Sequence, residues 1–410
     1  MLGRGFRDLW RFSLVSNLGD GVWVTALPLL AATLTRDPTA VAGVAVAAEL
    51  PWLLVSLAAG AIADRVDRRV LMVRVQYARL VAIALFAAAV AAGWMTLPLL
   101  YCSVFVLASA QVLVDTAAPT LLPRLVERPA LAAANARLFG IEMATNGMVG
   151  RPVGGLLSAV APAVPFVATA LSYGGSALLL RRLPGTFRPT VHDSDDSDDS
   201  DGSGVRRSMR AHVADGLRWV WRQPLIRTIT LVVTFMNLAR AMTMSIFVLY
   251  ALELLRLDGV GFGILTSAVA VGAVTGSLVN AWAGTRAAGP VLVAAVLAHG
   301  ATTVTMGLTS SPWVAGAASA GFGFAVMTWS VLTASVRQSV VPDELLGRVG
   351  SVHRFVSWGA APLGAVLGGV LAAALGLRAP LVIGGAAVIV AAVVFARSLA
   401  AAGAALDPGT

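Results

Sequence analysis

The chain has 410 residues, of which 58% are hydrophobic and only 12% are charged, and its mean hydropathy is +0.82. Soluble domains carry about a quarter charged residues, so this composition excludes a soluble enzyme, a disordered protein and a nucleic-acid-binding protein. The net charge of +9 fits arginines placed at a membrane face. One cysteine, Cys102, and four scattered histidines predict no disulfide within the chain and no metal site.

Apolar stretches long enough for membrane-spanning helices, about 20 residues each, follow one another along the chain. In the first half they cover 10–34, 39–63, 70–93, 97–121, 131–159 and 163–181. In the second half they cover 224–252, 259–282, 289–308, 312–336, 347–374 and 378–400. None alternates in the manner of a strand, so the sequence predicts an all-α membrane protein with twelve transmembrane helices. The first stretch is too long for a signal peptide and carries Asp20, so we expect it to be retained.

The basic residues predict the orientation of these spans, and all thirty of them are arginines. The loops on one side hold only Arg36, Arg256 and Arg378, and three more arginines, Arg79, Arg151 and Arg240, lie within spans. The remaining 24 lie on the other side. Because short cytoplasmic loops carry an excess of arginine, both termini are predicted to be cytoplasmic. An odd number of spans would destroy this asymmetry.

A polar segment at 183–223 divides the chain. It contains the acidic Ser/Asp run from Asp193 to Asp201, a composition that cannot bury enough apolar surface to fold. We interpret it as a cytoplasmic linker between two six-helix halves. The predicted parts are an N-terminal half (1–182), the linker (183–223), a C-terminal half (224–400) and a cytoplasmic tail (401–410).

The fifth and eleventh predicted spans resemble each other. Each follows a loop proline, Pro129 or Pro342, and each carries prolines and glycines at similar positions. The helix-packing residues are Gly150, Pro152, Gly154 and Gly155 in the fifth span and Pro362, Gly364, Gly368 and Gly369 in the eleventh. Paired glycines let helices approach closely. Two Gly/Ala-rich helices can also look alike by composition alone, but the matched prolines favour two parallel repeats with a substrate site between them.

The loop after the second span reads Gly60-Ala-Ile-Ala-Asp64-Arg65-Val-Asp67-Arg68-Arg69. Gly60 permits a tight helix end, Asp64 can accept hydrogen bonds from a helix N-terminus or from arginines, and the three matched arginines offer ion pairs. The loop resembles the Gly-x-x-x-Asp-Arg-x-x-Arg-Arg signature of the major facilitator superfamily. The resemblance implies a cytoplasmic gate, with Asp115 of the fourth span paired to the loop arginines.

Further segments narrow the resemblance. They are Asn17-Leu-Gly-Asp20-Gly, Glu49-Leu-Pro51, Asp115-Thr-Ala-Ala-Pro119, Leu122-Pro-Arg-Leu-Val126 and Arg354-x-x-x-Trp358-Gly. Together they are similar to the subfamily of macrolide-efflux and enterobactin-exporter-type permeases. The sequence departs from antiporter patterns at Gln111, which has no intramembrane arginine beside it, and at Arg151, which interrupts the usual Gly-Pro pair.

The resemblance implies a multi-pass protein of the inner (plasma) membrane of a high-GC bacterium. It implies export of a small amphipathic compound, such as a drug, antibiotic or siderophore-like metabolite, by proton antiport and alternating access. The expected partners are the lipid bilayer, a small-molecule substrate and protons, and we expect a monomer. The proton gradient supplies the energy, and no cofactor is expected.

Ionisable side chains within the spans are the candidate functional residues, because each costs at least about 2.5–3.5 kcal/mol at the bilayer centre. The proton or substrate candidates are Asp20, Glu49, Glu142, Arg151 and Arg240. A desolvated carboxyl can bind and release a proton near neutral pH, so one of the three acids is predicted to carry the proton. The alternative is that these acids form buried structural pairs with arginines, Arg79 included.

Two other functions remain open. A proton-coupled importer of a small metabolite would use the same fold and the same cycle, and a receptor or partner protein without transport is a third possibility. An enzyme is not expected, because the sequence shows no nucleophile–base set, no metal cluster and no phosphate-cradling loop.

Overall fold

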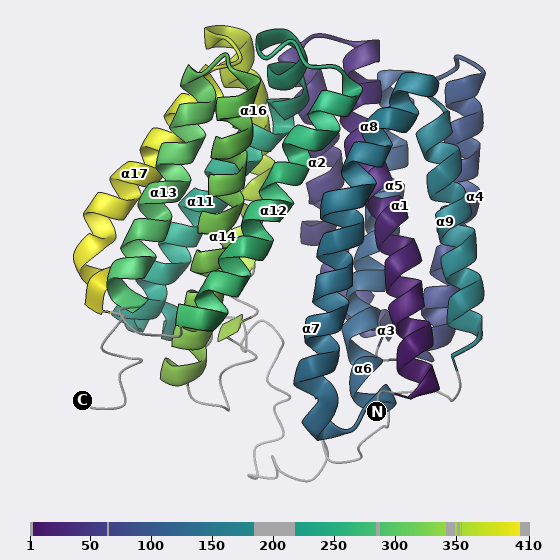
Figure 1. Ribbon diagram of the computed structural model, residues 1–410, viewed down its shortest axis with the longest axis horizontal. Coiled ribbons are helices and arrows are strands. Elements are labelled where there is room, and N and C mark those ends of the chain that lie inside the picture. Colours follow the sequence, from purple (N-terminus) through teal and green to yellow (C-terminus); the bar gives the residue numbers. More distant parts are fainter. Residues whose placement is uncertain are drawn as a thin grey trace, which may run out of the picture.

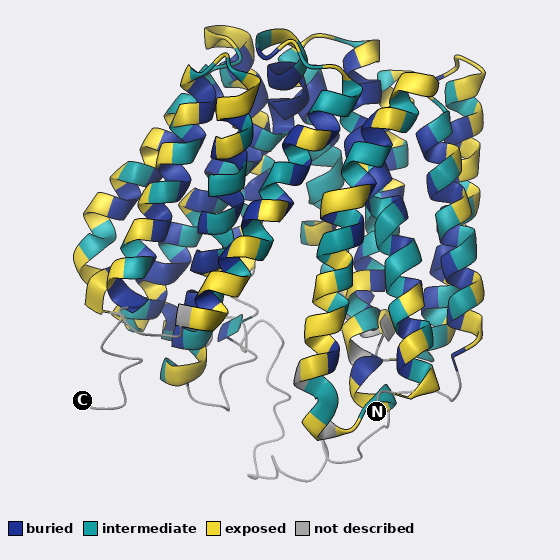
Figure 2. Cartoon of the chain, in the orientation of Figure 1, coloured by how far each residue is buried: buried dark blue, intermediate teal, exposed yellow. Residues whose placement is uncertain are grey.

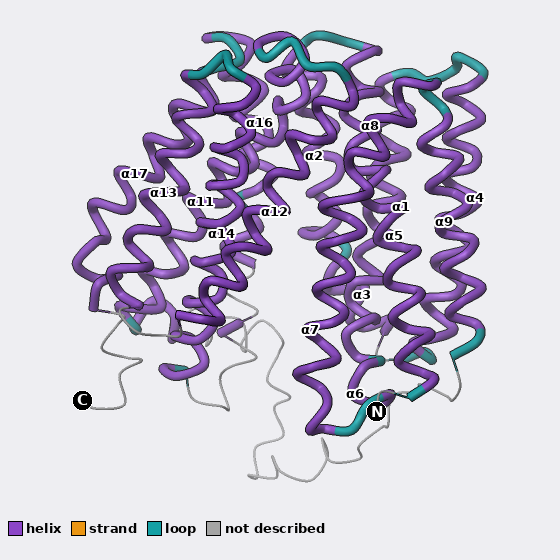
Figure 3. Tube along the Cα trace, viewed as in Figure 1, coloured by secondary structure: helices purple, strands orange, loops and turns teal. Residues whose placement is uncertain are grey.

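A computed structural model describes residues 3–63, 65–183, 218–283, 288–341, 349–350, 353 and 355–401. None of these residues lies in a strand, and helices make up most of the described chain (Figure 3). Among them, nine helices are long and apolar enough to cross a membrane, and Pro38–Leu54 is a shorter apolar helix. The acidic run of the linker, Asp64, Pro342 and most of the predicted tail lie outside the described residues.

The helices before the linker form one bundle, and those after it form a second (Figure 1). The first bundle consists of α1 (Arg4–Leu34), α2 (Pro38–Leu54), α3 (Ser56–Ala63), α4 (Arg68–Ala91), α5 (Leu97–Ala117), η1 (Ala118–Thr120), α6 (Leu122–Leu125), η2 (Arg128–Ala130), α7 (Leu131–Glu142), η3 (Met143–Gly150), α8 (Arg151–Val160) and α9 (Val164–Arg181). The second consists of α11 (Pro224–Leu249), η5 (Tyr250–Leu254), α12 (Gly259–Ala283), α13 (Ala288–Leu308), α14 (Pro312–Val340), α16 (Ala361–Leu375) and α17 (Ala379–Ala400).

The two bundles meet near one end only. We name the end where α1 begins and α17 ends the terminal face, and the opposite end the far face (Figure 1). Helix α2 packs on α11 and α16 of the other bundle, and η3 and α8 pack on α12. The continuations of these spans toward the terminal face, α3 and α7, pack chiefly within their own bundle, and there the ribbons diverge (Figure 1).

Several predicted spans are not single α-helices. The span predicted at 39–63 is broken after Leu54, one turn beyond Pro51, whose missing N–H and bulky ring disrupt a helix interior. The span predicted at 131–159 contains a π-helix, Met143–Gly150, and the span at 224–252 ends in another, Tyr250–Leu254. Such wide turns leave no periodic signal in the sequence, which explains why the sequence analysis missed them.

Two aspartates begin helices. The carboxylate of Asp37 accepts a hydrogen bond from the Thr39 N–H at 2.9 Å and caps α2. This hydrogen bond lowers the pKa of the exposed Asp37 carboxyl. In the loop expected to form the gate, Asp67 accepts from the N–H groups of Arg69 and Val70 at 3.0 and 3.1 Å and caps α4. Asp67 therefore has a structural role in that loop.

Many residues on the outward sides of both bundles are exposed (Figure 2), and large apolar side chains are among them. Leu85, Leu171 and Val393, from α4, α9 and α17, are each about two-thirds exposed or more. Extensive exposed apolar surface marks contact with a partner or a membrane. The interiors are packed with apolar clusters, such as Ile83, Phe86, Leu100 and Phe166 in the first bundle.

Candidate functional site

An ion pair between Asp20 of α1 and Arg79 of α4 lies inside the first bundle. Nη2 of Arg79 is 2.7 Å from Oδ1 of Asp20, and Tyr173 of α9 donates its hydroxyl to the same oxygen at 2.8 Å. The Arg79 guanidinium also lies 3.8 Å from the centre of the Tyr173 ring, a cation–π contact. The Arg79 side chain is 4% exposed and the Asp20 side chain is 15% exposed. The carboxylate is therefore paired with Arg79 and keeps some contact with solvent.

Further polar side chains continue this pair into a network. Nη1 of Arg79 donates to Gln76 at 3.1 Å, and the Gln76 amide donates to the hydroxyls of Ser16 and Ser176 at 3.1 and 2.9 Å. The network ties α1, α4 and α9 together. The sequence analysis did not single out Gln76, Tyr173 or Ser176. The i, i+3 spacing of Gln76 and Arg79, which places both on one helix face, was the available signal.

Two more acids of the first bundle interact electrostatically with Asp20. They are Asp115 on α5 and Glu142 at the end of α7, and Asp115 also interacts with Arg79. Both side chains are exposed. Asp115 accepts a hydrogen bond from Gln111 at 2.7 Å, whereas Glu142 has no hydrogen bond or ion pair within the described part of the chain. Asp20 and Asp115 therefore share the field of one buried guanidinium, and Glu142 interacts with the Asp20 carboxylate.

The loop expected to form the gate lies at the terminal face before α4. Arg65 lies in the turn after α3, Arg68 begins α4, and Arg69 donates to the carbonyl oxygen of Leu183 at 2.5 Å. The expected pairing of Asp115 with these arginines is not formed in this structure, where the hydrogen-bond partner of Asp115 is Gln111. Gly60 lies within α3.

A second ion pair joins the two bundles. Nη2 of Arg240 on α11 is 3.2 Å from Oε1 of Glu49 on α2, and the two side chains are 23% and 24% exposed. The Arg240 guanidinium lies 5.4 Å from the centre of the Trp358 ring. Two of the candidate residues, from opposite halves of the sequence, are thus in direct contact in this structure.

We expect the Glu49–Arg240 pair to couple the stability of the two bundles. In a double-mutant cycle with Glu49→Gln and Arg240→Gln, the coupling energy should be about 1 kcal/mol, since the pair is only partly exposed. Unfolding of the purified protein in detergent provides the measurement. The matched control is a second pair between bundles among the described residues, Arg36–Glu253, which is 3.8 Å long with side chains 59% and 41% exposed and should give a coupling near zero. Equal coupling energies in both cycles would contradict this assignment.

Arg151 also reaches the other bundle. It begins α8, directly after the π-helix, and its Nη1 donates to the carbonyl oxygen of Thr266 on α12 at 2.8 Å. It does not pair with Glu142, which lies on the other side of the π-helix. A carbonyl partner leaves the positive charge of Arg151 without an anion within the described residues.

The glycines of the two similar spans occupy equivalent positions. Gly154 of α8 lies against α1 of its own bundle, where an added Cβ would be 2.7 Å from the Val22 carbonyl oxygen, and Gly155 lies against the Gly259 backbone of α12. In α16, Gly368 lies against Met242 of α11 in its own bundle, and Gly369 lies against α2, with an added Cβ 2.7 Å from the Ala42 Cβ.

In each pair, one glycine therefore packs within its own bundle, and the next glycine packs against the other bundle. Gly150 and Gly364 also pack within their bundles, against α1 and α11, and Pro152 and Pro362 stand in the first turns of α8 and α16. This equivalence supports a repeat of the two halves over similarity of composition.

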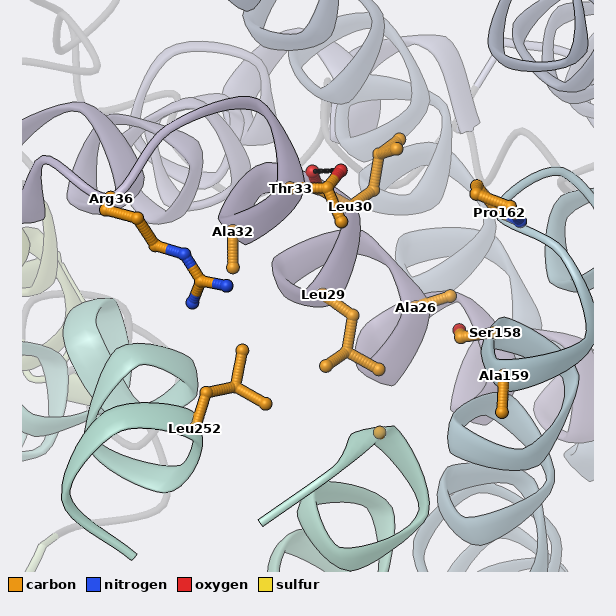
Figure 4. A pocket seen from close by; sticks show the side chains of 11 residues that line it. Ala26, Leu29, Leu30, Ala32, Thr33, Arg36, Ser158, Ala159, Pro162 and Leu252 are labelled. Atoms are coloured by element: carbon orange, nitrogen blue, oxygen red, sulfur yellow. Dashed lines mark hydrogen bonds between the residues drawn. The ribbon is translucent and has the colours of Figure 1, made fainter. Parts of the chain in front are cut away.

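A small cavity remains at the seam near the far face. Its volume is about 210 Å³, and it is lined by apolar residues of both bundles, including Leu29, Pro162 and Leu252. Arg36 points into it from the end of α1 (Figure 4). Pockets for drug-sized molecules measure about 300–1,000 Å³, so this cavity is too small to hold or pass one.

These features define a membrane transporter of the major facilitator superfamily, of the drug-exporter type. The chain belongs to the family described as transmembrane secretion effector, whose model matches residues 3–408. It is similar to the multidrug efflux pump Tap of Mycolicibacterium fortuitum, with 27% identity over 381 residues that cover 90% of this chain and 89% of Tap.

Solved structures show the same fold. The nucleoside transporter NupG superposes with a TM-score of 0.77 at 11% identity, covering 97% of this chain and 99% of NupG. A bacterial homologue of the iron transporter ferroportin, in an inward-facing state, superposes with a TM-score of 0.72 at 17% identity, with the same coverage of both chains. The chain thus shares its helical architecture with transporters of unlike cargo.

Proposed function

We propose that this protein exports a small amphipathic compound across the plasma membrane of a bacterium in exchange for protons. The buried Asp20–Arg79–Tyr173 network carries this proposal. Its carboxylate is held by a cation at 2.7 Å and a hydroxyl at 2.8 Å, and protonation of Asp20 would remove the negative charge that holds Arg79. A proton can therefore change the packing of three helices at once, which is what coupling to a proton gradient requires.

The proton path proposed here uses the exposed acids. Glu142, which has no partner among the described residues, and Asp115 lie within electrostatic reach of Asp20. A proton or a cationic group of the substrate would relieve the repulsion among the three carboxylates. Competition between the proton and the substrate for the same carboxylates gives antiport. Similarity to the efflux pump Tap supports the outward direction.

The proposed topology has twelve spans with both termini in the cytoplasm. The broken helices support this count, since α2 with α3, and α7 with η3 and α8, follow one another along the chain and would each form one crossing. Among the described residues, most arginines outside the spans lie toward the terminal face, which supports a cytoplasmic placement of that face. The bundles then meet on the outer side, as in an inward-open state.

The gate loop would act in the other state. When the bundles separate at the far face and approach at the terminal face, we propose that Asp64, Arg65, Arg68 and Arg69 brace the cytoplasmic side. Asp115, which accepts from Gln111 in the present state, would then be free to change partner.

Transport by the purified protein in liposomes tests the coupling. With an imposed pH gradient, we expect a fluorescent cationic dye to move against the direction of proton flow. Asp20→Asn should reduce gradient-driven transport at least about tenfold, because the amide can no longer take up and release the proton, and Glu142→Gln should reduce it as well. Glu127→Gln, which makes the same substitution in an exposed loop, should transport like the wild type.

The outcomes separate the rival functions. Dye movement that does not depend on the pH gradient and is unchanged by Asp20→Asn and Glu142→Gln would contradict proton coupling. Accumulation in the direction of proton flow would identify an importer. A complete absence of flux, with the protein folded and the dye bound, would favour a receptor.

A further inference from the structure

A second cavity lies at the terminal face between α1 and α7. Its volume is about 910 Å³, and three arginines line it: Arg7 and Arg11 of α1 and Arg137 of α7. Phe6, Trp10 and Ile141 form its apolar wall. Neither the proton path nor the contact between the bundles uses any of these residues. We propose that this cavity binds the headgroup and the upper acyl chain of an anionic phospholipid.

The charges around the cavity need a counter-ion. Arg11 has a partner, since its Nη1 lies 3.6 Å from Oδ1 of Asp8. Arg7 and Arg137 have no ion pair within the described residues, and both are exposed. Like charges around one concave site repel each other, and a bound anion reverses the sign of that interaction. Guanidinium groups bind phosphate oxygens through paired hydrogen bonds.

The apolar wall distinguishes a lipid from a free phosphate. Phe6 is 3% exposed and forms part of the packed floor, and Trp10 and Ile141 are half-buried beside it. A phosphate ion would contact only the arginines and leave this apolar surface in water. A phospholipid covers the apolar wall with its chain while its phosphate meets the arginines.

The position along the bundle fits the level of lipid headgroups. Arg7, Trp10 and Arg11 lie in the first turns of α1, which is long and apolar enough to span a membrane, and Arg137 lies in α7 near the same face. Tryptophan and arginine concentrate at this interfacial depth. Basic residues near the membrane surface each favour anionic lipids by about 1 kcal/mol.

Lipid binding to the full-length protein tests the proposal. The protein is purified, stripped of lipid in detergent, and titrated with phosphatidylglycerol or with phosphatidylcholine, and bound lipid is counted by native mass spectrometry. We expect one phosphatidylglycerol to bind in preference to phosphatidylcholine. Arg7→Gln with Arg137→Gln should weaken that binding roughly thirtyfold, as expected for two arginines. Arg74→Gln with Arg397→Gln removes the same charge from exposed positions outside the cavity and should change it less than twofold.

A second variant keeps every charge and fills the space. Ala133 lines the cavity and is exposed, so Ala133→Leu should weaken phosphatidylglycerol binding at least fivefold without lowering Tm in phosphatidylcholine. Competition with soluble glycerol phosphate separates the two sources of phosphate, and the soluble compound should compete at least a hundredfold more weakly than the lipid.

Three results would overturn the proposal. Equal weakening by the two double variants would show a general charge effect. Unchanged binding in Ala133→Leu would place the lipid elsewhere. Competition by glycerol phosphate as strong as that by the lipid would make the cavity a site for soluble phosphates. Transport assays do not enter this test, so its failure would leave the proposed export function untouched.

Discussion

Replacing Arg79 with methionine is expected to lower the free energy of unfolding by about 3 kcal/mol. The substitution leaves the Asp20 carboxylate in the interior with only the Tyr173 hydroxyl, and breaking a buried ion pair from one side costs about 3–5 kcal/mol. Because the Asp20 side chain is 15% exposed, we expect a loss of stability at the lower end of this range. Unfolding of the purified protein in detergent, titrated with dodecyl sulfate, provides the measurement.

Two variants control this result. Asp20→Asn combined with Arg79→Met removes both charges and should recover at least half of the lost stability. Arg74→Met changes the same residue type on the same helix at an exposed position and should change stability by less than about 0.5 kcal/mol. If the double variant is no more stable than Arg79→Met, the contribution of Arg79 is packing, and the proposed release of Arg79 on protonation of Asp20 loses its basis.

Replacing Gly155 with alanine is expected to open the far face. The added methyl group would lie against the Gly259 backbone of the other bundle, which cannot move aside as a side chain does. Overpacking of a close contact costs about 1–3 kcal/mol, and a shift of about 2 kcal/mol changes the ratio of closed to open states roughly thirtyfold. Gly369→Ala should act in the same direction, because Gly369 meets α2 in the equivalent way.

Distances between spin labels across the far face measure this opening. Cys102 is the one cysteine of the sequence, so Cys102→Ser gives a clean background for cysteines at Leu34 and Glu253, which are exposed on opposite bundles. The distance distribution should shift to longer values in Gly155→Ala, and transport should fall at least tenfold. Gly175→Ala, whose Cβ would make an ordinary 3.6 Å contact with Val15, should match the wild type. A distribution unchanged by Gly155→Ala would contradict a closing role for this contact.

The sequence predicted the class of fold because hydropathy and arginine placement depend on long stretches of chain. It also pointed to Asp20, Glu49 and Arg240 as charges that need a reason inside the membrane, and the structure places all three in ion pairs. Which acid pairs with which arginine was beyond the sequence, because pairing depends on how separate helices are rotated about their axes.

Other parts of the site left weaker signals. In the sequence, nothing distinguishes Tyr173 and Ser176 from other helix residues. Their contacts with Arg79 and Gln76 arise only because α9 packs beside α4. The π-helix at Met143–Gly150 changes the helical register between Glu142 and Arg151. A helical projection that assumes a regular α-helix therefore cannot predict on which faces these two residues lie. In this structure Asp115 accepts a hydrogen bond from Gln111, a partner that depends on the local arrangement of side chains, which a single sequence does not specify.

Part of the contact between the bundles at the far face consists of glycine backbone, and this has a consequence for the speed of the transport cycle. Closing a contact between leucine or isoleucine side chains freezes about 0.5–1 kcal/mol of rotamer entropy for each, whereas glycine, alanine and proline have almost none to lose. Gly155 against Gly259, and Gly369 against Pro38 and Ala42, can therefore form and separate with little entropic cost. Such a seam can be tight when closed and still open on the timescale of turnover.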